Sequence, residues 1–146
     1  MLKDKSINNI LEIGFNTGFS CILFKLLFPQ SKFLAIDINH HKYVVPCYNK
    51  IKTDFKNINI ILETSLEALP KLNEKYDLIH IDGCHNYNVA KQDILNSLKL
   101  SKPGTIIIFD DTDQKELCNE FILSKNWSEI FTKIKYKQCH RFFKVI

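Results

Sequence analysis

The chain has 146 residues, of which 45% are hydrophobic and 25% are charged, and its formal net charge is +4. This length predicts one domain over residues 1–146 that buries roughly 70% of its unfolded surface. The apolar runs are far shorter than the ~20 residues that span a membrane, so we expect no membrane partner. The basic residues are scattered lysines with Arg141 as the single arginine, which argues against a nucleic-acid partner because arginine is favoured for base and phosphate recognition.

The amino terminus and the cysteines indicate a cytoplasmic protein. Residues Met1 to Lys5 lack the apolar core of a signal peptide. The five cysteines are odd in number and contain no C-x-x-C pair. We therefore expect reduced thiols, with neither a disulfide framework nor a zinc site.

Apolar runs alternate with amphipathic segments along the chain. The runs predict strands at Asn9–Ile13, Phe33–Ile38, Ile58–Glu63, Asp77–Asp82 and Thr105–Asp110. The segments between and after them predict helices that include Phe19–Phe28, Tyr87–Leu100 and Gln114–Ser124, the second of them ended by Pro103-Gly104. Buried strands that alternate with helices predict a single doubly wound, Rossmann-like α/β domain with a mostly parallel sheet. The runs Ile130–Tyr136 and Arg141–Ile146 are expected to form an antiparallel edge.

The first strand leads into a glycine turn and then into a helix, which is the order of a nucleotide-binding βα unit. The turn consists of Gly14, Phe15, Asn16, Thr17 and Gly18. Asp37 ends the second strand nineteen residues after Gly18, where a carboxylate can bind two ribose hydroxyls. The turn is therefore the expected ligand-binding site.

The turn lacks two of the glycines found in dinucleotide-binding turns, and this restricts the class of ligand that it can bind. A dinucleotide fingerprint has three glycines, and the second lets a pyrophosphate approach the backbone closely. Asn16 and Phe19 occupy the second and third of these positions, so their side chains would crowd a pyrophosphate. A nucleoside without phosphates still fits, and S-adenosylmethionine is such a ligand. A NAD-dependent oxidoreductase is a distant alternative.

Polar side chains follow the carboxyl ends of all five predicted strands, where open α/β sheets bind their ligands. Several segments stand in a characteristic order: Leu11–Gly18, Asp37, Glu63–Pro70, Tyr76–Tyr87, Lys102–Gly104 and Asp110-Asp111. This order resembles that of class I S-adenosylmethionine-dependent methyltransferases over about Ile10 to Thr112. The likeness is greatest to the branch with an I-D-G-x-H-x-Y motif, which includes small-molecule and sugar O-methyltransferases.

The resemblance implies S-adenosylmethionine as cofactor and O-methylation of a small-molecule or sugar hydroxyl. The turn from Gly14 to Gly18 would cradle the methionine part of the cofactor, with Glu12 supporting it. Asp37 would hold the ribose. The remaining residues of the implied cofactor site are Ile38, Asp82, and Thr64 with Ser65 against the adenine.

The resemblance also implies a catalytic site. In metal-dependent members, carboxylates that match Asp82, Asp110 and Asp111 bind a divalent cation, and a histidine that matches His85 serves as general base. Three carboxylates suit Mg²⁺, which could orient a hydroxyl and lower its pKa. We therefore expect His85 and Asp82 to be catalytic, and we interpret His80, on the same strand face as Asp82, as a core histidine.

Alternatives to this interpretation stay open. Asp110 and Asp111 could cap the helix that follows them, and His85 could only brace its loop. The chain begins about eight residues before its first strand, whereas related enzymes commonly carry helices there that cover the cofactor. A homo-oligomer or another partner could then complete the small-molecule pocket, or the chain could be a non-catalytic S-adenosylmethionine-binding module.

Overall fold

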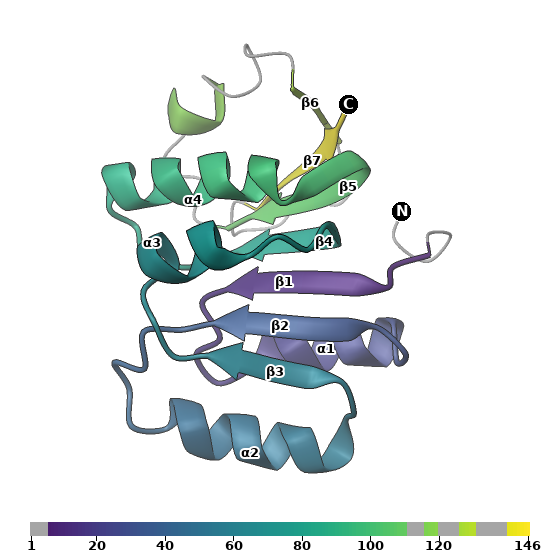
Figure 1. Ribbon diagram of the computed structural model, residues 1–146, viewed down its shortest axis with the longest axis vertical. Helices are drawn as coiled ribbons and strands as arrows, with labels where there is room; N and C mark the ends of the chain where they lie inside the picture. The colour runs from purple at the N-terminus through teal and green to yellow at the C-terminus, as the bar shows by residue number, and fades with distance from the viewer. Residues whose placement is uncertain (1–5, 111–115, 120–125, 131–139) are drawn as a thin grey trace.

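The computed structural model describes residues 6–110, 116–119, 126–130 and 140–146, and it confirms the predicted α/β architecture. Five parallel strands form most of one sheet (Figure 1). Their bounds are β1 Asn9–Ile13, β2 Lys32–Ile36, β3 Ile58–Ile61, β4 Tyr76–Ile81 and β5 Ser101–Phe109. The carboxyl ends of these strands all point to the same side, on the left of Figure 1.

The strand order is β3-β2-β1-β4-β5-β7-β6. The order reverses between β1 and β4, and this is the position at which open α/β sheets bind ligands. An antiparallel edge is confirmed, but its first strand comes earlier than predicted: β6 is Trp127–Glu129 and pairs with β7, Arg141–Val145. The predicted run Ile130–Tyr136 is described only at Ile130, which follows β6.

The helices lie between the parallel strands. Their bounds are α1 Phe19–Leu27, α2 Val44–Asp54, α3 Ser65–Ala68 with the 3₁₀ turn η1 Leu69–Lys71, and α4 Tyr87–Lys99. The prediction that Pro103-Gly104 ends α4 is wrong. The helix ends at Lys99 because Leu100 leaves helical geometry, with φ −89° and ψ 0°, and β5 begins at Ser101, so both predicted end residues belong to β5. The predicted helix Gln114–Ser124 is described at residues 116–119, which are helical, and its other residues lie outside the described ranges.

Two hydrophobic cores cover the two faces of the sheet. Side chains of α1 and α2 pack with Ile10 of β1 and Leu78 of β4 on one face, while side chains of α3 and α4 pack with Leu11 and Ile79 on the other. Successive strand residues point to opposite faces, so a strand covered on both sides must be apolar at nearly every position. This requirement explains the continuous apolar runs of the sequence.

Two further features of the described chain bear on the expectations from sequence. Its cysteines Cys21, Cys47, Cys84 and Cys118 are free thiols, as predicted, and Cys139 lies outside the described ranges. None of the helices that could be searched reaches the length and apolar character required to cross a membrane.

Candidate active site

The glycine turn is a tight backbone loop between β1 and α1. Gly14 and Gly18 have φ angles of 93° and 77°, and Asn16 between them has a φ of 49°. A Cβ atom at Gly14 would lie 2.0 Å from the carbonyl oxygen of Asp82. Gly14 is therefore required both by its left-handed conformation and by the close approach of the turn to the end of β4.

Asp37 holds the same turn from the end of β2. Its Oδ2 accepts hydrogen bonds from the backbone N–H groups of Phe15 at 3.0 Å and Asn16 at 2.9 Å, and its Oδ1 accepts one from Asn39 at 2.7 Å. An ionised carboxylate has about four acceptor positions. Three are in use, so binding of two ribose hydroxyls would require release of one backbone partner.

The other predicted cofactor residues differ in what they can offer a ligand. The side chain of Phe15 is buried in the core, so only its backbone can line the turn. Asn16 and Thr17 are exposed, and Asn16 accepts a hydrogen bond from the hydroxyl of Tyr43 at 2.8 Å. Ile38 is 61% exposed and offers an apolar surface beside Asp37.

Thr64 and Ser65 begin α3 beyond the end of β3. Thr64 is exposed, and its hydroxyl donates a hydrogen bond to Glu67 at 2.9 Å, while Ser65 is buried. The backbone N–H of Glu67 bonds in turn to the carbonyl of Thr64. Thr64 thus helps to begin a helix, and Ser65 faces inward toward α4.

Glu12 and His80 form a buried pair across β1 and β4. The two residues are register partners, and Glu12 Oε1 lies 2.9 Å from His80 Nδ1. The hydroxyl of Ser20, in the first turn of α1, also donates to Glu12 Oε1. Burial acts to lower the pKa of His80, but the hydrogen bond with Glu12 and the negative charges of Glu12, Asp82 and Asp110 outweigh it and raise that pKa above its ordinary value.

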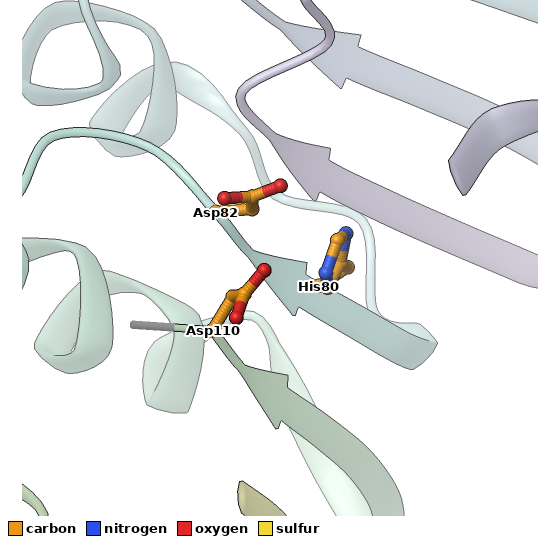
Figure 2. Close-up of side chains that lie close together, drawn as sticks. All are labelled: His80, Asp82 and Asp110. Carbon is orange, nitrogen blue, oxygen red and sulfur yellow. The ribbon is translucent and has the colours of Figure 1, made fainter. Parts of the chain in front are cut away.

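His80, Asp82 and Asp110 lie together at the carboxyl ends of β4 and β5 (Figure 2). One ligand atom from each residue lies within 4.8 Å of the other two. Asp82 and Asp110 therefore meet as predicted for a cation site, whereas Asp111 lies outside the described residues.

Two histidines at these strand ends were not predicted as site residues: His80 of the cluster, and His140, which contacts it. His80 was assigned to the core alone; it is indeed buried, but its i, i+2 spacing from Asp82 was the available signal that both point to one place. His140 Nδ1 lies 2.7 Å from Asp110 Oδ1. It could not be found from the sequence, because the pairing of Phe109 with Arg141 that places it there depends on the register of the last strand.

His85 lies at the mouth of the same region. It is exposed in the loop after β4, and it lines a small cavity together with Gly83, Cys84 and Asp110. Asn86, which follows it, caps α4 by accepting a hydrogen bond from the backbone N–H of Asn88 at 3.0 Å. The helix cap is thus provided by Asn86, and His85 lines the cavity beside Asp110.

Asp93 of α4 is a buried carboxylate behind the site. Its side chain is fully buried, and in the described part of the chain neither of its oxygens has a hydrogen-bond partner within normal geometry. Burial raises the pKa of Asp93 to about 6, and the nearby hydroxyl of Ser65 lowers it only in part. The ionised form is therefore costly in the folded protein.

We expect Asp93 to make folding stability depend on pH. Because its folded pKa of about 6 exceeds its ordinary value of 3.8, the folded state holds the proton more tightly, and stability falls as the pH rises from about 4 through about 6. Asp93→Asn should raise the free energy of unfolding by about 3 kcal/mol at neutral pH and change it little at acidic pH. Urea unfolding across this range measures the difference.

Asp77→Asn is the matched control for this prediction. Burial acts to raise the pKa of Asp77, but hydrogen bonds from Lys102 and from the backbones of Asn9 and Asn8 lower it overall. Its folded pKa is thus depressed, so its ionised form stabilises the fold and Asp77→Asn should destabilise the protein at neutral pH. Equal effects of the two substitutions would contradict the assignment for Asp93.

Comparison with known proteins gives the family. A methyltransferase domain family matches residues 11–112. Malonyl-[acyl-carrier protein] O-methyltransferase 2 of Ilyobacter polytropus is 31% identical over 106 residues, which is 72% of this chain and 39% of that protein. An uncharacterised protein of Sinorhizobium fredii is 31% identical over 49% of this chain and 8% of its own length. The chain thus spans well under half the length of these two relatives.

Solved structures support the same fold. The N-methyltransferase NodS of Bradyrhizobium japonicum superimposes with a TM-score of 0.72 at 17% identity, covering 99% of this chain and 89% of that one. A ribosomal protein L11 methylase of Lactobacillus delbrueckii gives a TM-score of 0.75 at 17% identity, covering 97% and 71%. The family match includes the glycine turn, Asp37, Asp82 and Asp110, so the chain belongs to the class I S-adenosylmethionine-dependent methyltransferase domain family.

Proposed function

We propose that the chain transfers a methyl group from S-adenosylmethionine to a hydroxyl group of a small molecule or sugar. The observation that carries this proposal is the contact between the glycine turn and the end of β4, where a Cβ at Gly14 would meet the carbonyl of Asp82. A cofactor on the turn would therefore lie beside the cluster of His80, Asp82 and Asp110.

The reaction requires different tasks of the residues at the carboxyl ends of β4 and β5. The hydroxyl oxygen attacks the methyl carbon in line with the carbon–sulfur bond, which breaks and leaves S-adenosylhomocysteine. The hydroxyl loses its proton, and we assign His85, an exposed imidazole in the loop after β4, as the base that accepts it. Asp82 and Asp110, with Asp111, would hold a divalent cation that orients the hydroxyl and lowers its pKa.

Oxygen is the proposed acceptor atom for three reasons. The motif Ile81-Asp82-Gly83-Cys84-His85-Asn86-Tyr87 resembles that of small-molecule and sugar O-methyltransferases. The relative from Ilyobacter polytropus is named as an O-methyltransferase, although its acceptor is a malonyl group on a carrier protein. A neutral hydroxyl is a poor nucleophile, so it also needs a base and a bound cation, which are the tasks proposed for His85 and for Asp82 with Asp110.

Calorimetric titration with S-adenosylmethionine tests the proposal, with S-adenosylhomocysteine and NAD as comparators. We expect both adenosyl ligands to bind and NAD not to bind. A screen of hydroxyl acceptors, followed by S-adenosylhomocysteine release, then tests turnover. Tighter binding of NAD would contradict the cofactor, and binding without turnover on any acceptor class would favour a non-catalytic or partner-dependent module.

Asp37→Ala should weaken S-adenosylmethionine binding by about tenfold to a hundredfold, because it removes a charged acceptor that both the turn and the ribose would use. The three backbone hydrogen bonds that Asp37 accepts would be lost with it. Asp54→Ala is the control, since Asp54 is an exposed carboxylate at the end of α2. The same titration measures both variants. If Asp37→Ala binds S-adenosylmethionine as tightly as the control does, Asp37 has no role in cofactor binding.

A further inference from the structure

The cluster at the ends of β4 and β5 contains a nitrogen donor as well as two carboxylates. His80 is 7% exposed, and its imidazole lies beside the side chains of Asp82 and Asp110 (Figure 2). The predicted cation site of the sequence consisted of carboxylates alone. An imidazole among them changes the class of ion that the donors suit.

Each end of this cluster is held by a further side chain. Glu12 Oε1 lies 2.9 Å from His80 Nδ1, and His140 Nδ1 lies 2.7 Å from Asp110 Oδ1. Protein metal sites characteristically have such outer partners, which orient the ligating imidazole and carboxylate. The arrangement therefore has the features of a metal site in its outer contacts as well as in its inner donors.

The position of Glu12 also decides which imidazole nitrogen is available. Because Nδ1 faces Glu12, an ion among Asp82 and Asp110 would be bound by Nε2. Within the described ranges, His80 forms no hydrogen bond other than the one to Glu12. The second oxygen of Glu12 is buried and likewise has no hydrogen-bond partner among those residues.

We propose that His80, Asp82 and Asp110 bind one divalent first-row transition-metal ion, such as Mn²⁺, Co²⁺ or Zn²⁺, in preference to Mg²⁺. This proposal rests on the proposed function, which includes a divalent cation, and it names the chemical class of that cation. Imidazole suits transition metals, whereas Mg²⁺ is bound mainly by oxygen. Glu12 and His140 act as positioning residues for His80 and Asp110.

The test is titration of the full chain with Co²⁺, followed by visible absorption and calorimetry, with Mg²⁺ as competitor. We expect one tight Co²⁺ site whose spectrum shows a nitrogen ligand, and Mg²⁺ binding weaker by about tenfold or more. His80→Gln should weaken Co²⁺ binding by more than about tenfold and leave Mg²⁺ binding almost unchanged. Glu12→Gln should weaken Co²⁺ binding by about tenfold to a hundredfold through loss of orientation.

His41→Ala is the matched control, since the exposed pair His40-His41 could bind Co²⁺ on its own. This variant should keep the tight site. Equal Co²⁺ affinity of His80→Gln and the parent chain, or competition by equimolar Mg²⁺, would overturn the proposal. If His80→Gln fails to fold by circular dichroism, Asp110→Asn replaces it with the same expected loss, because Asp110 is only half-buried.

The outcome is separate from that of the proposed function. Binding of S-adenosylmethionine is measured by calorimetry without added metal, and it depends on the glycine turn and Asp37. A chain that binds the cofactor but not Co²⁺ would refute only the metal proposal, whereas a chain that binds Co²⁺ but neither adenosyl ligand would refute only the methyltransferase function.

Discussion

Gly14→Ala is expected to lower the free energy of unfolding by about 2–5 kcal/mol. A left-handed backbone costs a residue with a Cβ roughly 1–2 kcal/mol, and a clash in a packed region adds about 1–3 kcal/mol. The clash follows from the 2.0 Å between an added Cβ and the carbonyl oxygen of Asp82. Neither the turn nor the end of β4 can move aside easily, because both are backbone.

Gly104→Ala is a closely matched control for this experiment. Gly104 has a φ of 92°, almost the same as the 93° of Gly14, but an added Cβ there would have no neighbour within 4 Å. Chemical denaturation should therefore show a loss of only about 1–2 kcal/mol for Gly104→Ala. If the two substitutions cost the same, the contact between the turn and Asp82 does not constrain Gly14. If Gly14→Ala stays folded, its S-adenosylmethionine affinity should also fall.

His85→Ala is expected to lower turnover by about 10² to 10⁴-fold while S-adenosylmethionine affinity stays unchanged. General base catalysis commonly contributes this much. His85 is exposed beside Gly83 and Asp110 and belongs to neither core, so its loss should not disturb the turn. The measurement is the release of S-adenosylhomocysteine under saturating cofactor.

Chemical rescue distinguishes a base from a structural residue. Because position 85 is exposed, added imidazole can reach it and should restore part of the turnover of His85→Ala. His41→Ala, which changes an exposed histidine near α2, should show neither the loss nor the rescue. Loss of cofactor binding in His85→Ala would assign His85 to the architecture of the loop instead of the chemistry.

The sequence predicted the sheet well because its strands are buried on both faces. Continuous apolar runs such as Phe33–Ile36 and Ile106–Ile108 have few other structural explanations, and the glycine turn and Asp37 mark the carboxyl ends of the first two strands. The end of α4 was predicted within one residue, at Leu100 instead of Lys99, but Pro103-Gly104, which were expected to end it, lie in β5. Leu100 itself leaves helical geometry, and the strand begins at the next residue.

Only the carboxylates of the cluster formed by His80, Asp82 and Asp110 were predicted from the sequence. Asp82 and Asp110 follow the carboxyl ends of β4 and β5, and parallel neighbouring strands bring these ends to the same edge of the sheet whatever their side chains are. The i, i+2 spacing of His80 from Asp82 indicates that the two share a strand face, but the contact of His80 with Glu12 depends on β1 and β4 being neighbours in register. His140 required the register of an antiparallel strand far along the chain, which local patterns do not encode.

The contact between His140 and Asp110 bears on the order in which the site is completed during protein synthesis. The glycine turn and Asp37 leave the ribosome early, whereas His140 reaches Asp110 only after β7 has paired with β5. A domain generally folds as a unit. Although the glycine turn and Asp37 are synthesised early, the site is therefore complete only when the last described strand joins the sheet and His140 reaches Asp110.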